Sequence, residues 1–179
     1  MFRNRTRAAI PVALVITTLA AYALPAKAHV TLETRAYPAG STAKLVLKVP
    51  HGCEGSPTVN LRVRIPDNVL NVKPQPKAGW QLATVKGKLA NPIKGEHGQM
   101  ITESVREIQW TGGRLEDSFY DEFVFRAQLP DQPGATIYIP VVQECEKGVN
   151  RWIETPEPGK TRRDYKTPAP ELRLLPKQQ

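Results

Sequence analysis

The sequence predicts an all-β fold, an antiparallel two-sheet sandwich of the immunoglobulin or cupredoxin kind. After residue 28, apolar and polar residues alternate with a period of two in several short stretches, as expected for strands with one buried face. Clusters of proline, glycine and aspartate separate these stretches, and none of them has a sustained helical period. About seven short strands with turn signals between them are typical of a sandwich.

The N-terminal region has the parts of a secretory signal. Residues 1–7 are basic, residues 8–24 are largely apolar, and residues 26–28 are Ala-Lys-Ala, which fits the small-x-small cleavage pattern. We therefore predict that residues 1–28 are a cleaved signal peptide, that the protein is secreted into the periplasm, and that His29 becomes the first residue of the mature chain. The alternative is a membrane anchor, because the apolar run approaches the roughly 18–20 residues that a span needs.

Cleavage would lower the formal net charge from +8 to +4, because residues 1–28 hold four basic residues and no acidic one. With both signs interspersed and no arginine cluster in its body, the mature chain is not expected to bind nucleic acid. Residues 29–158 are long enough for one sandwich domain of ordinary size. Residues 159–179 are rich in proline and charge and contain no apolar run of membrane length. We expect most of them to form a mobile tail, in which Leu172, Leu174 and Leu175 could add one edge strand or pack locally, and we expect no membrane span in the mature chain.

Within the predicted domain, the alternation marks a series of strands. Val59, Leu61 and Val63, for example, alternate with polar residues and share one face. The predicted strands cover residues 44–49, 59–65, 80–85, 105–110, 122–129 and 136–143. Prolines at positions 50, 66 and 130 end three of them, because proline cannot donate to a strand ladder. Residues 89–102 show no alternation and are expected to form a long polar loop.

The chain contains two cysteines, Cys53 and Cys145, and each lies at the end of a predicted strand. In an exported protein such a pair predicts a disulfide bond. In the chain-entropy model, a closed loop of this length stabilises the fold by roughly 4–5 kcal/mol. The alternatives are a soft site for Cu(I) or a redox pair, and the wide separation without a C-x-x-C spacing favours the disulfide.

His29 is the strongest candidate for a functional residue. An N-terminal histidine offers a metal both its free α-amine and its ring nitrogen Nδ1, which can close a chelate on one ion. Both nitrogens must be deprotonated, and reference pKa values of roughly 7.7–8 for an α-amine and about 6.5 for an imidazole make this feasible near neutral pH. Two nitrogen donors favour Cu(II), which has the highest affinity in the divalent series. The alternative is that His29 merely follows the cleavage site.

A third donor must come from another part of the fold. Glu33 lies close to His29 in sequence, but four residues of strand cover about 13 Å, too far for one metal ion. Glu122 is the more attractive carboxylate, because it starts a predicted strand on the face opposite Phe123 and should point out of the core. The alternative for Glu122 is an exposed acid without a ligand role. Trp152 either packs beside the metal or anchors the core.

Several short motifs occur in order along residues 29–158. They are His29-Val30-Thr31, the ten residues from Val49 to Thr58, Lys77-Ala78-Gly79-Trp80, Asp121-Glu122-Phe123, Leu129-Pro130, and Gln143-Glu144-Cys145-Glu146 followed by Trp152. With them, the chain resembles the YcnI-like family, a copper-binding domain formerly of unknown function. The resemblance implies a β-sandwich that holds Cu(II) at the mature N-terminus through a single-histidine brace, with a carboxylate and a nearby tryptophan. Transferred to this sequence, the brace is His29, the carboxylate Glu122 and the tryptophan Trp152.

The resemblance is to the proteobacterial type, because the chain has the cysteine pair and no C-terminal membrane helix. It implies a periplasmic copper-binding protein, not an enzyme, that serves copper trafficking or homeostasis together with other periplasmic or membrane copper-handling proteins. Two other functions stay open. A copper-dependent oxygenase or oxidase of the N-terminal-histidine type would need a second histidine on the metal, from His51 or His97. A metal-free scaffold sandwich would bind no copper.

Overall fold

The computed structural model describes residues 29–95 and 98–177. The predicted signal peptide and His97 lie outside the described residues. The described elements are β-strands and one short 3-10 helix, η1 (Arg162–Asp164), and none is a helix long and apolar enough to span a membrane. The strands are β1 (Thr31–Leu32), β2 (Ala36–Pro38), β3 (Thr42–Val49), β4 (Thr58–Arg64), β5 (Leu70–Pro74), β6 (Gln81–Lys94), β7 (Met100–Leu115), β8 (Asp121–Gln128), β9 (Thr136–Tyr138), β10 (Val141–Cys145), β11 (Val149–Trp152) and β12 (Glu171–Leu175).

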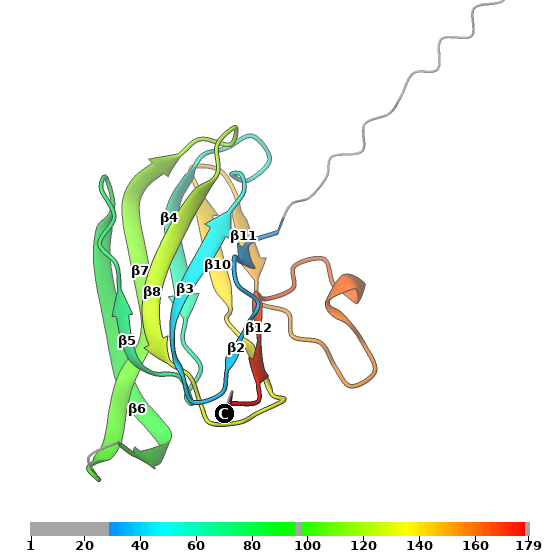
Figure 1. The fold of residues 1–179 in the computed structure, drawn as a ribbon. Helices are drawn as coiled ribbons and strands as arrows, with labels where there is room; N and C mark the ends of the chain where they lie inside the picture. Colours follow the sequence, from blue (N-terminus) through cyan, green and yellow to red (C-terminus); the bar gives the residue numbers. More distant parts are fainter. Residues whose placement is uncertain (1–28, 96–97, 178–179) are drawn as a thin grey trace, which may run out of the picture.

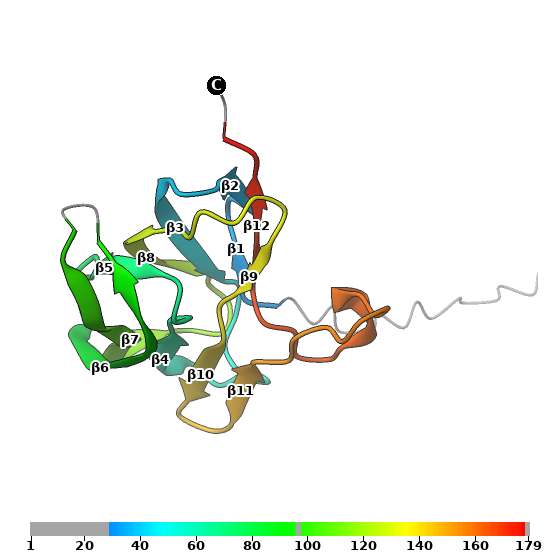
Figure 2. The ribbon, with the colours of Figure 1, turned by 90° about the horizontal axis from the view of Figure 1, so that it is seen from below.

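Two antiparallel sheets form the layers of the fold (Figure 1), which confirms the predicted all-β sandwich. The first sheet has the strand order β1-β3-β8-β5, and the second has the order β11-β10-β4-β7-β6. A third, small sheet has the order β2-β12-β9 and pairs β12 with β2 in parallel. Figure 2 shows this small sheet on the side of the molecule away from the long β6–β7 hairpin.

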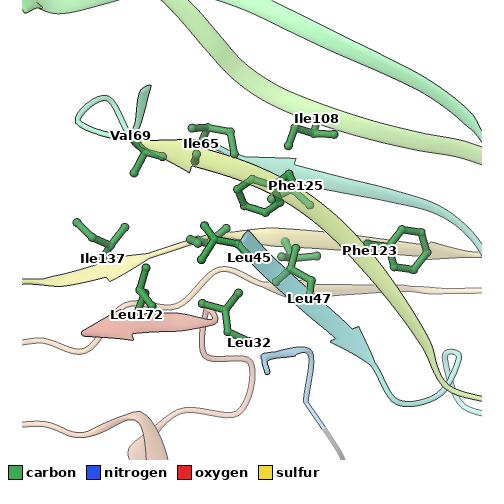
Figure 3. Packing of buried hydrophobic residues seen from close by; sticks show 14 of the residues in the cluster. Leu32, Leu45, Leu47, Ile65, Val69, Ile108, Phe123, Phe125, Ile137 and Leu172 are labelled. Carbon is green, nitrogen blue, oxygen red and sulfur yellow. The ribbon is translucent and has the colours of Figure 1, made fainter. Parts of the chain in front are cut away.

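The core lies between the sheets and is built by the predicted alternation. In β3 and β8, Leu45 pairs with Phe125 and Leu47 pairs with Phe123, so both strands present an apolar face at the same positions. Ile108 of β7 is buried in the same cluster (Figure 3). Burying each such side chain contributes roughly 1.5–3 kcal/mol. All buried members of this core cluster lie between residues 30 and 174.

The predicted strand over residues 136–143 is two strands in the structure. Residues 136–138 join the third sheet as β9, whereas β10 begins at residue 141 and joins the second sheet. Pro140 lies between them and cannot donate to a ladder, although its carbonyl accepts a hydrogen bond from the Arg64 backbone at 2.9 Å. The chain therefore passes from the third sheet to the second within residues 136–143, although the alternation of apolar and polar residues is unbroken there.

The predicted polar loop over residues 89–102 is instead largely part of the β6–β7 hairpin. β6 continues to Lys94, and β7 begins at Met100. Most side chains of this part are exposed on both faces of the hairpin, so their polarity does not alternate. β5 was not predicted from the sequence, because its last residue, Pro74, is a turn signal. β5 is an edge strand, and proline is tolerated at such an edge.

The C-terminal region belongs to the domain, and the predicted boundary at residue 158 is wrong. β12 lies at the centre of the third sheet, between β2 and β9. Its Leu172 and Leu174 are fully buried in the core cluster. A short strand of five residues can hold such a place because alternate side chains face the core while its backbone pairs on both sides. Residues 171–175 therefore belong to the fold and are not part of a tail.

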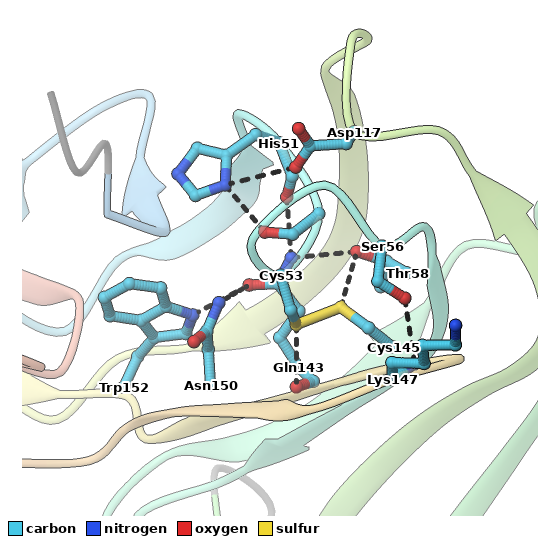
Figure 4. Close-up of a disulfide and its surroundings, with 11 residues drawn as sticks. His51, Cys53, Ser56, Thr58, Asp117, Gln143, Cys145, Lys147, Asn150 and Trp152 are labelled. Carbon is cyan, nitrogen blue, oxygen red and sulfur yellow. Dashed lines mark hydrogen bonds and ion pairs between the residues drawn. A yellow bond between two sulfur atoms is a disulfide. The ribbon is translucent and has the colours of Figure 1, made fainter. Parts of the chain in front are cut away.

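A disulfide joins Cys53 to Cys145, the pair that the sequence predicts (Figure 4). Cys53 lies in the turn between β3 and β4, and Cys145 ends β10. The bond therefore ties the turn after β3 to the second sheet, close to the end of the molecule where β1 begins.

Candidate metal centre

His29 lies two residues before the start of β1, and its ring is held by two contacts. Its Nε2 lies 3.1 Å from the carbonyl oxygen of Lys166, and its ring meets that of Trp152 edge to face, with centroids 5.2 Å apart. A carbonyl oxygen can only accept, so Nε2 carries the proton in this hydrogen bond. Nδ1 of the neutral ring then keeps its lone pair. Nδ1 is the ring nitrogen that can close a chelate with the amine of the same residue.

Trp152 is the last residue of β11, and it is 3 % exposed. Its indole Nε1 donates to Oε1 of Gln143 at 3.0 Å. The Gln143 side chain donates in turn to the His51 carbonyl at 2.7 Å and to the Thr58 hydroxyl at 2.8 Å (Figure 4). Trp152 therefore packs in a fixed orientation against His29, and that orientation depends on a buried amide beside the disulfide.

Glu122 lies on the outer face of the first sheet. It pairs with Lys48 of β3, which pairs with Thr31 of β1, so its backbone is two strand spacings, or about 10 Å, from Thr31. Its side chain points away from the fully buried Phe123, which is the orientation that the sequence predicts. Glu122 and His29 line the same pocket, which has a volume of about 570 Å³.

Glu33 also lines this pocket, although the spacing along the strand predicts that it is too far from His29 to share a metal ion. Within the described part of the chain, the carboxylates of Glu33 and Glu122 have no hydrogen bond or ion pair. Lys48 and Tyr120 line the pocket as well. The pocket thus contains two carboxylates that are free to take a ligand.

Two other carboxylates near these segments are already engaged. Asp121 accepts from Lys77 Nζ at 2.6 Å and from the Glu122 backbone at 2.8 Å. Glu154 accepts two hydrogen bonds from Thr167, from its backbone and its hydroxyl, each at 2.7 Å. These hydrogen bonds lower the pKa of Glu154 below its ordinary value. In each acid these bonds fall on one oxygen, Oδ1 of Asp121 and Oε2 of Glu154, and they fix the orientation of the carboxylate.

His51 does not join His29. Its Nδ1 lies 2.6 Å from the Gly52 carbonyl and 4.0 Å from a carboxylate oxygen of Asp117, and it is not among the residues that line the pocket of His29. Over residues 29–95 and 98–177, no group of three or more His, Cys, Asp or Glu side chains is placed to hold a metal ion.

Two contributors to the site escaped the sequence analysis. Gln143 had a signal that could have revealed it, because it lies in the inward row of β10 between Val141 and Cys145, where a polar side chain needs buried partners. The carbonyl of Lys166 had none, because every residue carries a carbonyl and only the fold selects one.

Comparisons with known proteins identify the family. No curated protein sequence matches the chain. A solved structure described as "Crystal structure of an uncharacterized protein from Nocardia farcinica reveals an immunoglobulin-like fold" is 21 % identical, covers 82 % of this chain and 98 % of that chain, and superposes with a TM-score of 0.61. This likeness shows that the fold is immunoglobulin-like. A family model described as "Domain of unknown function (DUF1775)" matches residues 29–174, from the first residue of the candidate site to the penultimate residue of β12, and the chain therefore belongs to the DUF1775 family.

Proposed function

We propose that this protein is a YcnI-like periplasmic copper-binding protein, not an enzyme, that carries Cu(II) at the N-terminus of its mature chain. The ligands are the amine and Nδ1 of His29 and a carboxylate oxygen of Glu122, with Trp152 packed beside them. The observation that carries the proposal is the hydrogen bond between His29 Nε2 and the Lys166 carbonyl. It leaves Nδ1 as the ring nitrogen with a lone pair, and a second hydrogen-bonded nitrogen is the usual way in which proteins orient a metal-binding imidazole.

The donor set fits Cu(II) in chemistry. Two nitrogens and one carboxylate suit a tetragonal copper site and leave a charge of about +1, with positions open to water or to a partner's donor. A carrier that must release its metal requires such open positions. The Trp152 ring, which is buried and held by Gln143, shields one side of the imidazole from water.

Glu122 is the proposed carboxylate for two reasons. It lines the pocket of His29, and its side chain has no competing partner within the described residues. Glu33 shares both properties, but it follows β1 in the same segment, four residues after His29. Glu33 therefore serves as the matched control for Glu122.

Export follows from the pattern of residues 1–28 and is part of the proposal, because the brace exists only when His29 carries a free amine. The disulfide between Cys53 and Cys145 supports an oxidising compartment such as the periplasm. The partners would be periplasmic or membrane copper-handling proteins that donate or accept the metal.

The test is a titration of Cu(II), followed by electron paramagnetic resonance, of two forms of the protein. One begins at His29, which retains the whole described core, and the other carries one additional glycine before His29. The addition converts the amine to an amide, so the affinity should fall at least about a hundredfold while the fold is unchanged. Equal affinity and identical spectra for the two forms would show that the brace does not exist.

The carboxylate is tested on the form that begins at His29. Glu122→Gln should weaken binding and change the copper spectrum, whereas Glu33→Gln should change neither. If Glu33→Gln alters the spectrum and Glu122→Gln does not, the brace stands and the assignment of the carboxylate is wrong.

A further inference from the structure

A second pocket lies next to His29, between the segment that leads into β2 and the segment before β12. Its volume is about 750 Å³. The segment from 153 to 170 projects from the sandwich beside β11 and β12 and supplies most of its wall (Figure 1). The lining residues are His29, Thr31, Arg35, Thr161, Arg162, Arg163, Tyr165, Pro168 and Glu171. His29 and Thr31 line both this pocket and that of Glu122.

The pocket is strongly basic. Three arginines, Arg35, Arg162 and Arg163, line it together with a single acid, Glu171, which gives a net charge of +2. Within the described part of the chain, none of these arginines forms an ion pair. The nearby carboxylate of Asp164 is turned to the backbone and hydroxyl of Thr161, at 2.7 and 2.9 Å, and is not among the residues that line the pocket. Glu171 therefore offsets only part of the positive charge of the pocket.

Arg162 shows that this charge is costly to the protein. Its guanidinium makes one long hydrogen bond, 3.4 Å to the Val30 carbonyl, and its Nε is buried without a partner among the described residues. Burial, and then the like charge of Arg35, lower the pKa of Arg162. A partly buried cation whose Nε has no acceptor destabilises a fold unless a ligand supplies the missing acceptor.

We propose that this pocket binds a small oxyanion with at least two negative charges, of the carboxylate or phosphate class. Guanidinium groups match the paired oxygens of both classes, and a dianion would neutralise the charge of the lining residues. The Tyr165 hydroxyl accepts a hydrogen bond from the Glu157 backbone at 2.9 Å and keeps its own proton for the ligand. The inference goes beyond copper binding, because no metal is needed to hold the anion.

The test is isothermal titration calorimetry on the metal-free protein that begins at His29. Citrate and inorganic phosphate are titrated in separate arms, with the ionic strength held constant by sodium chloride. Metal is removed with a chelating resin, because EDTA is itself a polycarboxylate and would compete. We expect one anion per chain in at least one arm, and the arm that binds more tightly identifies the class.

Variants assign the binding to the pocket. Arg35→Met and Arg163→Met keep the apolar stem, remove one exposed charge each, and should weaken binding about tenfold or more. Arg162→Met should also weaken anion binding about tenfold or more. If that variant is unstable, Arg35→Met and Arg163→Met alone test whether the anion binds in this pocket. Arg126→Met removes the same charge from the exposed face of β8, outside the pocket, and should change the affinity less than twofold. The inference is overturned if neither anion binds, or if Arg126→Met weakens binding as much as the pocket variants. Since copper is absent throughout, failure of the copper site would not affect the result.

Discussion

Gln143→Leu should destabilise the protein and loosen the support of His29. Leucine has a similar volume but leaves the buried Trp152 indole N–H and Thr58 hydroxyl without the Gln143 amide, and it removes the hydrogen bonds of that amide with the His51 carbonyl and the Asn150 amide. Each buried group left unpaired costs about 1–3 kcal/mol. The apolar side chain gains roughly 1.5–3 kcal/mol in return, because Gln143 is only 1 % exposed. The expected net loss in the free energy of unfolding is about 2–4 kcal/mol.

The measurement is urea denaturation together with differential scanning calorimetry. For a domain of this size, the expected loss corresponds to a fall in melting temperature of roughly 5–15 °C. Gln81→Leu is the matched control, because Gln81 is exposed on the edge strand β6, and it should change the stability by less than about 0.5 kcal/mol.

A double-mutant cycle separates the indole hydrogen bond from the rest of the network. Trp152→Phe removes the donor, so the combination with Gln143→Leu should be less destabilising than the sum of the two single changes, by about 1 kcal/mol. A Gln143→Leu variant as stable as the Gln81→Leu control would refute the assigned network. A cycle with strictly additive effects would show that Gln143 does not hold Trp152.

Three further predictions concern the fold. Replacing Cys53 and Cys145 together by serine should lower the melting temperature but leave Cu(II) binding in place, and intact mass after alkylation of the native protein should show no free thiol. Leu172→Ala should cost about 2–5 kcal/mol in urea denaturation, whereas Leu175→Ala, at a residue 37 % exposed, should cost far less; equal effects would contradict the place of β12 in the core. Glu154→Gln should destabilise the protein at neutral pH, because the folded pKa of this carboxyl is lowered and its stabilising effect is present above the unfolded value of 4.5. The difference from the unchanged protein should shrink as the pH falls below about 4.5, and a difference that stays constant down to pH 2 would contradict the assignment.

The sequence by itself determined the fold class and most of the strands. Alternation with a period of two is a local property, and it marks a strand with one buried face wherever that strand pairs. The same parity placed Glu122 on the face opposite Phe123, as the structure has it. Proline at positions 50, 66 and 130 ended strands for an equally local reason, the missing backbone donor.

Only the tertiary structure decided which segments meet. The Lys166 carbonyl that holds the ring of His29 is 137 residues away in sequence and has no side-chain signature. Arg162 and Arg163 of the basic pocket are adjacent in sequence, but only the fold brings the distant Arg35 to them. β12 was taken for part of a tail because five residues carry too weak a pattern alone, and its burial depends on pairing with β2 and β9. Such long-range contacts follow from the packing of the whole chain, because the free energy that selects them comes from burying surface that no local pattern defines.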